Sequence, residues 1–376
     1  MDGTRALFDV NASIQKHIAM LKPWFPTRAV VCIGEYPVRI LLKGQLTAKT
    51  EDALPVFVDK SSKDISKWSP RPLDEHSFLG LDMDVEGHFW FDVLPHITKN
   101  GFMSRLKNTS VDKVHEAVVV ASTWEAFASA LLPTFLGQSK AWNLNYVAFA
   151  VLPSKLQPPD AQFNAFSCLG MCVSKDFTPI LLLHRDQLEG YVGVDRQGSI
   201  IKGNAVLDYV LEIVLTKETL VQDMFDLLKP FNTRMCGVLA VTGASLRIYG
   251  SLENILSTTL VKPLTEFDLA SASLVYVVVR LPLKLKDKLS KGKIELAVAD
   301  WFSSKANLRS VYVGEPIYVE DAFDRIDLVM VVGGFNTTKM VASMEKEVGV
   351  IKNPFIEKGF IKKEEWQAIA KSLLET

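Results

Sequence analysis

The segment Val118 to Pro133, VVVASTWEAFASALLP, constrains this chain most, because it is an apolar strand that runs directly into a helix. At such a junction many nucleotide-binding α/β proteins place a glycine-rich loop, whose backbone N–H groups contact phosphate. Here the turn contains no glycine and carries the rings of Trp124 and Phe127 and the carboxylate of Glu125. The rings block a close approach to the backbone, and the carboxylate repels phosphate. The segment predicts the scaffold of a nucleotide-binding protein with a loop unsuited to a nucleotide.

The charge balance argues against a highly charged main partner. The chain has 376 residues, with 42 Lys and Arg and 43 Asp and Glu, so its formal net charge is -1. This gives no electrostatic reason to expect nucleic acid or an anionic membrane as the main partner. The strongest apolar runs, Leu274–Val279 and Leu328–Val332, are too short to span a bilayer, and the first residues lack the apolar core of a signal peptide. We expect a cytoplasmic protein with no membrane span.

The sequence offers two weak candidates for metal binding. Cys168 and Cys172 lie four residues apart, on one face of a predicted helix, but no second Cys/His pair has suitable spacing, which favours buried free thiols. In the segment from Asp82 to His88, strand alternation would place Asp82, Asp84 and Glu86 on one face, as a hard-cation site would need. A solvated edge strand explains the same pattern better. We predict no metal site.

Apolar strands alternate with helices in the first half of the chain. The predicted strands are 30–33, 118–121, 146–152 and 179–183, with helices around Leu131 and over 163–172, which favours a parallel sheet covered on both faces. A long helix is predicted from Gly203 to about Leu220. Then come β-rich segments at 238–241, 274–279, 311–319 and 327–332, with a helix over 294–302, typical of a smaller α+β domain. The expected units are therefore 1–202 (with an N-terminal helix over 11–21), a linking helix 203–222, a second domain 223–335, and a charged tail 336–376 that Pro354 breaks.

This order of elements resembles the tubulin/FtsZ superfamily, in which a nucleotide-binding domain, a long central helix and a smaller activating domain follow one another. VVVASTWEAFASALLP lies without gaps on the FtsZ strand, its GGGTGTG phosphate loop and the next helix. Arg185-Asp186-Gln187-Leu188 is similar to the family's Asn-Asp-Lys-Leu, and the segment from Pro263 to Leu269 is similar to its Pro-Leu-Leu-x-x-x-Asp-Leu. The resemblance covers about residues 28 to 335. It implies a divergent, cytoskeletal FtsZ-like protein of prokaryotic, archaeal type.

The resemblance also implies a set of catalytic positions. In such proteins the activating domain of one subunit inserts acidic residues into the nucleotide pocket of the next, and hydrolysis needs a polymer. The family pattern Asn-x-Asp-x-x-Asp falls on Val221 to Asp226, so Asp223 and Asp226 are retained and the leading Asn is replaced by Val221. Positioned carboxylates can orient a water. Alternatively, Asp223 caps or flanks a helix and Asp226 is a solvated acid of its first turn.

The departures from the family pattern outweigh these matches. The first glycine-rich loop is replaced by a stretch that begins at Gly34 and contains Glu35 and Pro37, and proline removes an N–H donor. Ser129 alone remains of the GGGTGTG loop, on its second threonine, and Arg185 replaces a nucleotide-contacting Asn. Asn204, near the start of the central helix, either faces a base or caps that helix. Each lost charge-assisted hydrogen bond costs roughly 1.5–3 kcal/mol, so the sequence predicts that ordinary GTP binding is lost.

The tail carries an apolar stripe of Trp366, Ile369 and Leu373 on a helix predicted over 363–374. The stripe either docks into a groove on a partner or folds back onto its own domain.

Three hypotheses follow. The first is a scaffolding protein that self-associates head to tail or binds a related FtsZ-type protein and holds no cofactor. The second is an atypical GTPase, using GTP and Mg²⁺ with Asp223 and Asp226 at a subunit junction. The third is an unrelated two-domain α/β enzyme.

Overall fold

The computed structural model describes residues 27–44, 53–69, 78–82, 87–99, 101–110, 112, 114–320 and 323–375. The helix predicted over 11–21, and Asp84 and Glu86, lie outside these ranges. The elements of the first half are β1 (Arg28–Ile33), α2 (Glu35–Gly44), β2 (Ala53–Asp59), α4 (Ser62–Trp68), β3 (Phe78–Gly80), α5 (Trp90–Lys99), α6 (Phe102–Ser110), β4 (Glu116–Ser122), α7 (Ala126–Leu136), α8 (Ser139–Trp142), β5 (Asn145–Leu152), α9 (Pro159–Val173), β6 (Ile180–His184), α10 (Arg185–Gly190), β7 (Val192–Val194) and β8 (Ile200–Lys202).

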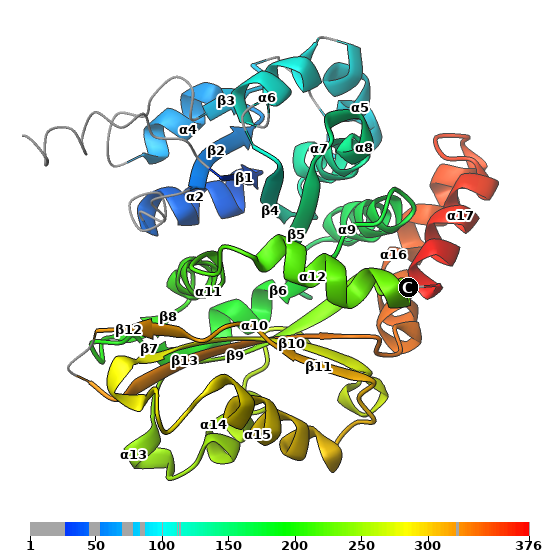
Figure 1. Cartoon of the computed structure of the whole chain (residues 1–376). Coiled ribbons are helices and arrows are strands. Elements are labelled where there is room, and N and C mark those ends of the chain that lie inside the picture. The colour runs from blue at the N-terminus through cyan, green and yellow to red at the C-terminus, as the bar shows by residue number, and fades with distance from the viewer. Residues whose placement is uncertain are drawn as a thin grey trace, which may run out of the picture.

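The second half begins with two short helices and ends with a helical hairpin (Figure 1). Its elements are α11 (Ala205–Leu215), α12 (Leu220–Leu228), η2 (Lys229–Phe231), β9 (Met235–Ser245), α13 (Leu246–Tyr249), α14 (Leu252–Thr258), η3 (Leu269–Ser271), β10 (Leu274–Pro282), η4 (Leu283–Leu285), α15 (Lys291–Ser303), β11 (Ser310–Val313), β12 (Ile317–Val319), β13 (Arg325–Gly333), α16 (Thr338–Glu357) and α17 (Lys363–Leu374).

One sheet runs through both halves, in the order β11-β10-β13-β9-β6-β5-β4-β1-β2-β3. The strands from β1 to β6 pair in parallel, as the buried, β-branched runs of the sequence predicted, and β9 continues them in parallel with β6. Strand β13 is antiparallel to both β9 and β10. The junction between the halves is only three residue pairs long, from Ile180↔Met235 to Leu182↔Gly237. The predicted α/β fold is confirmed, with a mixed rather than purely parallel sheet.

Two of the expected elements differ in the structure. The long helix predicted over 203–222 is two helices, because α11 ends at Leu215 and α12 begins at Leu220. The guanidinium of Arg28, at the start of β1, donates to the carbonyls of Leu215 and Lys217 and so binds the backbone groups that a continuous helix would use. The β-rich segment 311–319 is likewise two short strands, β11 and β12.

The helices cover the sheet in separate layers. In Figure 1, α11 and α12 lie between the upper and lower parts of the sheet, where their apolar residues share a core with α2, β4 and β10. Helices α5, α7 and α9 cover the other face of the first half, and α14 and α15 cover the outer face of the second. All four cysteines are buried free thiols, as predicted.

The C-terminal segment is part of the folded body. Helix α16 runs through Pro354 to Glu357, so the expected break at this proline does not occur. Trp366 of α17 is only 3% exposed and stacks on Phe163 and Phe166 of α9, with ring centroids 5.4 and 5.0 Å away. Ile369 and Leu373 are buried on the same side. Of the two alternatives for the stripe, the structure therefore shows the second: it folds back on its own chain, so the surface it would offer to a partner is already covered.

Candidate functional site

The site begins where β1 turns into α2. Gly34 adopts a φ of +93°, which glycine tolerates best. A Cβ at this position would collide with Ser122, Glu125 and Ala128, so the absence of a side chain lets α7 approach. We expected a loop after Gly34, but the stretch that follows forms the first turn of α2. Pro37 is tolerated there because the backbone N–H groups of a helix's first turn have no intrahelical acceptor. The turn therefore keeps backbone donors despite its proline.

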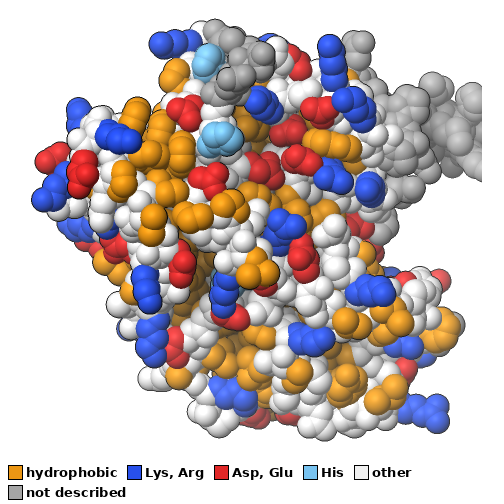
Figure 2. Space-filling view, turned by 180° about the vertical axis from the view of Figure 1, so that it is seen from behind, with side chains coloured by type: hydrophobic (Ala, Val, Ile, Leu, Met, Phe, Trp, Pro, Cys, Tyr) orange, Lys and Arg blue, Asp and Glu red, His pale blue; other side chains and the backbone are white. Residues whose placement is uncertain are grey.

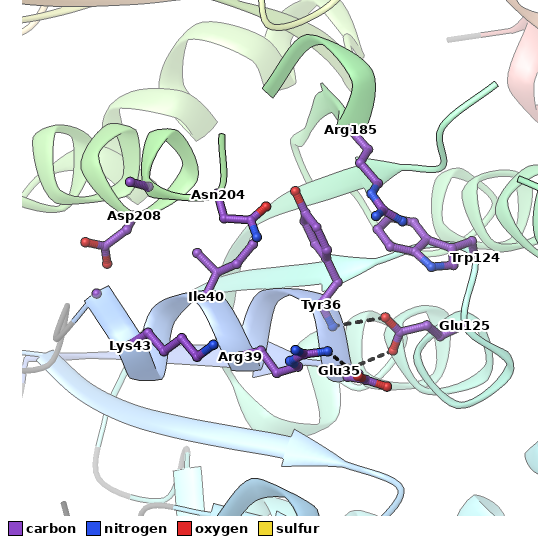
Figure 3. Close-up of a pocket in the computed structure, with 12 residues that line it drawn as sticks. Glu35, Tyr36, Arg39, Ile40, Lys43, Trp124, Glu125, Arg185, Asn204 and Asp208 are labelled. Carbon is purple, nitrogen blue, oxygen red and sulfur yellow. Dashed lines mark hydrogen bonds and ion pairs between the residues drawn. The ribbon is translucent and has the colours of Figure 1, made fainter. Parts of the chain in front are cut away.

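The carboxylate of Glu125 takes those donors. Its Oε2 accepts a hydrogen bond from the backbone N–H of Glu35 at 2.6 Å, and its Oε1 accepts one from that of Tyr36 at 3.1 Å. A helix N-terminus is the kind of place where a phosphate binds, through orphan N–H groups and the helix dipole. In this chain an internal carboxylate occupies that place (Figure 3).

The environment of Glu125 perturbs its proton affinity. The pKa of this carboxyl is raised from 4.5 to about 7: burial and, second, the nearby charge of Asp59 raise it, whereas hydrogen bonds from Ser122, Tyr36 and Glu35 lower it. Burial also raises the pKa of Asp59 from 3.8 to about 6. A phosphate here would meet two acids in addition to the carboxylate of Glu35.

A cavity of about 530 Å³ opens beside this contact. One wall is an aromatic and cationic stack: the rings of Tyr36 and Trp124 meet edge to face at 5.2 Å, and the guanidinium of Arg185 lies 5.2 and 5.6 Å from their centroids. Arg185 is held by Glu189, whose Oε1 accepts from its Nε at 2.7 Å. The residues around the cavity are Glu35, Tyr36, Arg39, Ile40, Lys43, Gly44, Trp124, Glu125, Arg185, Asn204, Ala205 and Asp208.

The structure brings together four of the residues predicted for a vestigial pocket: Trp124, Glu125, Arg185 and Asn204. Asn204 precedes α11 and is exposed, without a capping hydrogen bond from its side chain. Gly34 lies beneath Glu125 rather than on the cavity wall.

Two further predicted residues do not reach this cavity. Ser129 is buried in α7, where its hydroxyl donates to the carbonyl of Glu125 at 2.8 Å. Phe127, expected to block the pocket, packs edge to face on Phe102 at 6.0 Å and lines a neighbouring cavity instead. It turns away because α7 begins at Ala126, which places Phe127 on the face that α7 presents to the core.

Sequence reasoning missed the residues that α2 contributes. Tyr36, Arg39 and Lys43 line the cavity from successive turns of this helix. Their spacing of three to four residues was a helical signal, hidden because we read the stretch as a replaced glycine loop.

The two predicted catalytic acids lie elsewhere. Asp223 is buried in α12 and accepts hydrogen bonds from Thr219 at 2.9 Å, Tyr276 at 2.9 Å and Tyr312 at 3.3 Å. Tyr276 is near the beginning of β10, so Asp223 lies at the opposite end of the sheet from the cavity. Asp226 is exposed and accepts from Gln222 at 2.7 Å. Asp223 therefore stabilises its own subunit, whereas Asp226 is accessible.

Among the described residues, no group of three or more His, Cys, Asp or Glu side chains is arranged to hold a metal ion. The backbone N–H groups of Glu35 and Tyr36 at the N-terminus of α2 are taken by Glu125, and Trp124 lines the cavity beside them. No helix in the described ranges is long and apolar enough to cross a membrane.

Comparison with known proteins places the fold. No family model and no curated protein matches the chain. The solved structure of CetZ from Methanosaeta thermophila matches with a TM-score of 0.67 and 15% identity, over 91% of this chain and 96% of that one. CetZ2 from Haloferax volcanii, solved as a GTPγS-bound protofilament, matches with a TM-score of 0.63 and 14% identity, over 89% and 100%. An empty FtsZ dimer from M. jannaschii matches with a TM-score of 0.60 and 14% identity, over 86% and 92%. At these identities the likeness shows the fold, which is the tubulin/FtsZ fold that the sequence predicted.

Proposed function

We propose that this chain is a structural or scaffolding protein of the tubulin/FtsZ fold that has lost ordinary GTP binding and acts through contacts between subunits. The observation that carries the proposal is the carboxylate of Glu125 on the backbone N–H groups of Glu35 and Tyr36. A ligand phosphate would have to displace this carboxylate and then lie close to the acids that remain, and both steps oppose binding.

Self-association is the activity that survives such a change. Subunit contacts need complementary surfaces rather than a phosphate loop, so they outlast the loss of the pocket. Structures of the same fold were solved as a CetZ2 protofilament and as an FtsZ dimer, which supports head-to-tail contacts with itself or with a related FtsZ-type protein. On this proposal, the part before α11 is the degenerate GTPase-type domain and the part after α12 is the activating-type domain.

The proposal is tested by isothermal titration of the full chain with GTP and with GDP at near-millimolar concentration. We expect no heat of binding for either nucleotide. A matched variant, Trp124→Gly with Glu125→Gly, removes both obstacles and is expected to bind GDP weakly. Micromolar binding by the unmodified chain would refute the proposal.

Assembly is measured separately, by analytical ultracentrifugation and negative-stain microscopy with and without GTP. We expect oligomers whose size is the same under both conditions. A chain that stays monomeric at every concentration contradicts the scaffolding role.

A second candidate is an atypical GTPase, favoured by the exposed carboxylate of Asp226 on α12. It requires GTP turnover by the unmodified chain that Asp226→Ala abolishes. Absence of turnover in the unmodified chain removes this candidate.

A further inference from the structure

A run of lysines follows β10. Between Leu283 and Lys293 the chain carries five lysines and one carboxylate, that of Asp287. The run covers η4 and the first turn of α15. The near-neutral charge of the whole chain therefore averages over a basic segment and a more acidic remainder, which composition alone does not show.

Four of these lysines form no ion pair with a described carboxylate. Among the described residues, Lys286, Lys288, Lys291 and Lys293 form no ion pair with a carboxylate, whereas Lys352 pairs with Glu345 at 3.1 Å. The Nζ atoms of two of them lie over rings, Lys286 over Tyr318 and Lys291 over Tyr312, each at 5.4 Å from the centroid. Lys293 donates to the carbonyl of Asp287 at 2.9 Å. Such contacts hold the lysine side chains in place without an ion pair to any carboxylate in the described ranges.

Large apolar side chains are exposed among these charges. Leu283 of η4 is 46% exposed, and Leu296, one helical turn after Lys293 on α15, is 63% exposed. Ile248 of α13 is 78% exposed. The adjoining Arg247 of α13 donates its backbone N–H to Asp324. The charge of Lys284, in η4, contributes to lowering the pKa of the same Asp324. Helix α13 and η4 therefore lie at the same end of the sheet. We call Leu283, Lys286, Lys288, Lys293, Leu296 and Ile248 the basic edge.

The upper half of the opposite face has a different character. Helix α15 lies toward the viewer in Figure 1, and Figure 2 shows the molecule from behind. Over the upper half of that view, basic and acidic side chains are interspersed, as on an ordinary solvated surface (Figure 2).

The combination of free cations and exposed aliphatic side chains defines the partner. Phosphates of a nucleic acid would attract the lysines but offer no apolar phase to Leu283, Leu296 and Ile248. An anionic bilayer offers both, since its headgroups attract lysine and its acyl boundary accepts aliphatic side chains. We propose that the basic edge docks this protein on membranes that contain anionic phospholipid. The protein then lies on the membrane without spanning it, and this inference does not depend on the fate of the nucleotide site.

The test is co-sedimentation of the full chain with vesicles of phosphatidylcholine alone or of phosphatidylcholine with phosphatidylserine. We expect binding only to vesicles with phosphatidylserine, weakening as salt is added. Each lysine near such a surface contributes roughly fivefold in affinity, so Lys286→Glu with Lys288→Glu and Lys293→Glu is expected to lose at least about 100-fold.

The matched control has the same charge change on exposed lysines of the C-terminal hairpin: Lys346→Glu, Lys358→Glu and Lys363→Glu. It is expected to lose far less binding than the edge variant. A third variant, Leu283→Ser with Leu296→Ser, is expected to bind more weakly while keeping the same dependence on salt. Circular dichroism establishes that each variant is folded.

The proposal fails if the unmodified chain does not sediment with phosphatidylserine vesicles at low ionic strength, or if the control variant loses as much binding as the edge variant. It also fails if duplex DNA is bound through these lysines and anionic vesicles are not.

Discussion

The contact between Glu125 and α2 predicts an unusual dependence of stability on pH. The perturbation is Glu125→Gln, which keeps the shape of the side chain and removes its ionisation. The carboxylate accepts hydrogen bonds from the backbone N–H groups of Glu35 and Tyr36, whereas the single oxygen of glutamine accepts only one of them. The variant therefore removes the titration of this side chain and one of its two hydrogen bonds while keeping its packing.

The magnitude follows from the raised pKa. Burial, with the charge of Asp59, raises the pKa of Glu125 from 4.5 to about 7, so between these values the folded state holds more protons than the unfolded state. Where the folded state binds more protons, the free energy of unfolding decreases as pH rises. The difference between the two pKa values corresponds to about 3 kcal/mol, and we take this as an upper limit because the side chain is partly exposed. This penalty is absent below the unfolded pKa and complete above pH 7.

The assay is urea unfolding of both proteins at several pH values between 4 and 8. Subtracting one free energy from the other removes the contributions of groups that do not interact with Glu125. We expect the unmodified chain to lose up to about 3 kcal/mol relative to Glu125→Gln across this range. The exposed Glu357→Gln serves as a control and is expected to show no such trend. A difference between the unmodified chain and Glu125→Gln that stays constant with pH, or that has the opposite slope, would refute the reasoning.

Three further predictions concern packing and buried charge. Trp366→Ala removes a ring stacked on two others and is expected to lower the free energy of unfolding by about 3–5 kcal/mol in urea, whereas a change below about 1 kcal/mol would mean that α17 does not pack on α9. Asp223→Ala leaves buried hydroxyls without their acceptor and is expected to cost about 1–3 kcal/mol, while Asp226→Ala stays within about 0.5 kcal/mol; equal shifts in thermal unfolding would contradict this assignment. Arg280→Met leaves the carboxylate of Asp327 buried without its cation, which lies 2.9 Å away, and is expected to cost about 3–5 kcal/mol, partly recovered by adding Asp327→Asn; an additive loss in the double variant would argue against the pair.

The parts of the fold that the sequence predicted are those whose pattern is set locally. Strands β4, β5 and β6 are buried on both faces and therefore read as continuous apolar runs. Helix α17 spans the residues predicted for it, because its apolar stripe has helical spacing. Neither pattern required knowledge of a distant contact.

The parts that the sequence did not predict depend on such contacts. The break between α11 and α12 is held by Arg28, which is more than 180 residues away in the chain. The apolar spacing continues across the break, so periodicity alone predicted one helix. The sequence left two alternatives for Trp366, docking on a partner or folding back. The structure decides for folding back, because Trp366 stacks on rings of α9, and these rings lie outside the tail.

The predicted site contains both kinds of feature, those set by local residue types and those set by distant contacts. The prediction that the phosphate loop is lost could be read from residue types, since Trp124 and Glu125 stand where the family resemblance leads us to expect glycines. The position of the carboxylate could not, because it requires that α2 begin at Glu35, and we read that stretch as a loop. The residue types predicted an effect unfavourable to phosphate, and the structure adds that the same carboxylate accepts two hydrogen bonds from the backbone of α2.

The contact between Glu125 and the N-terminus of α2 affects how assembly would be controlled. In a pocket that depends on a ligand, the orphan N–H groups of the helix are satisfied only when the ligand binds, so binding orders the junction between β1 and α2. Here Glu125 satisfies two of these groups permanently, and Gly34 gives it the room to do so. The cation of Arg185 over Tyr36 and Trp124 further fixes the wall of the cavity. A ligand can shift a conformational equilibrium only by binding one state better than the other, and a junction already held by its own side chains leaves little such difference. On the proposed function, subunit contacts are therefore governed by concentration and by surfaces such as the basic edge rather than by a nucleotide.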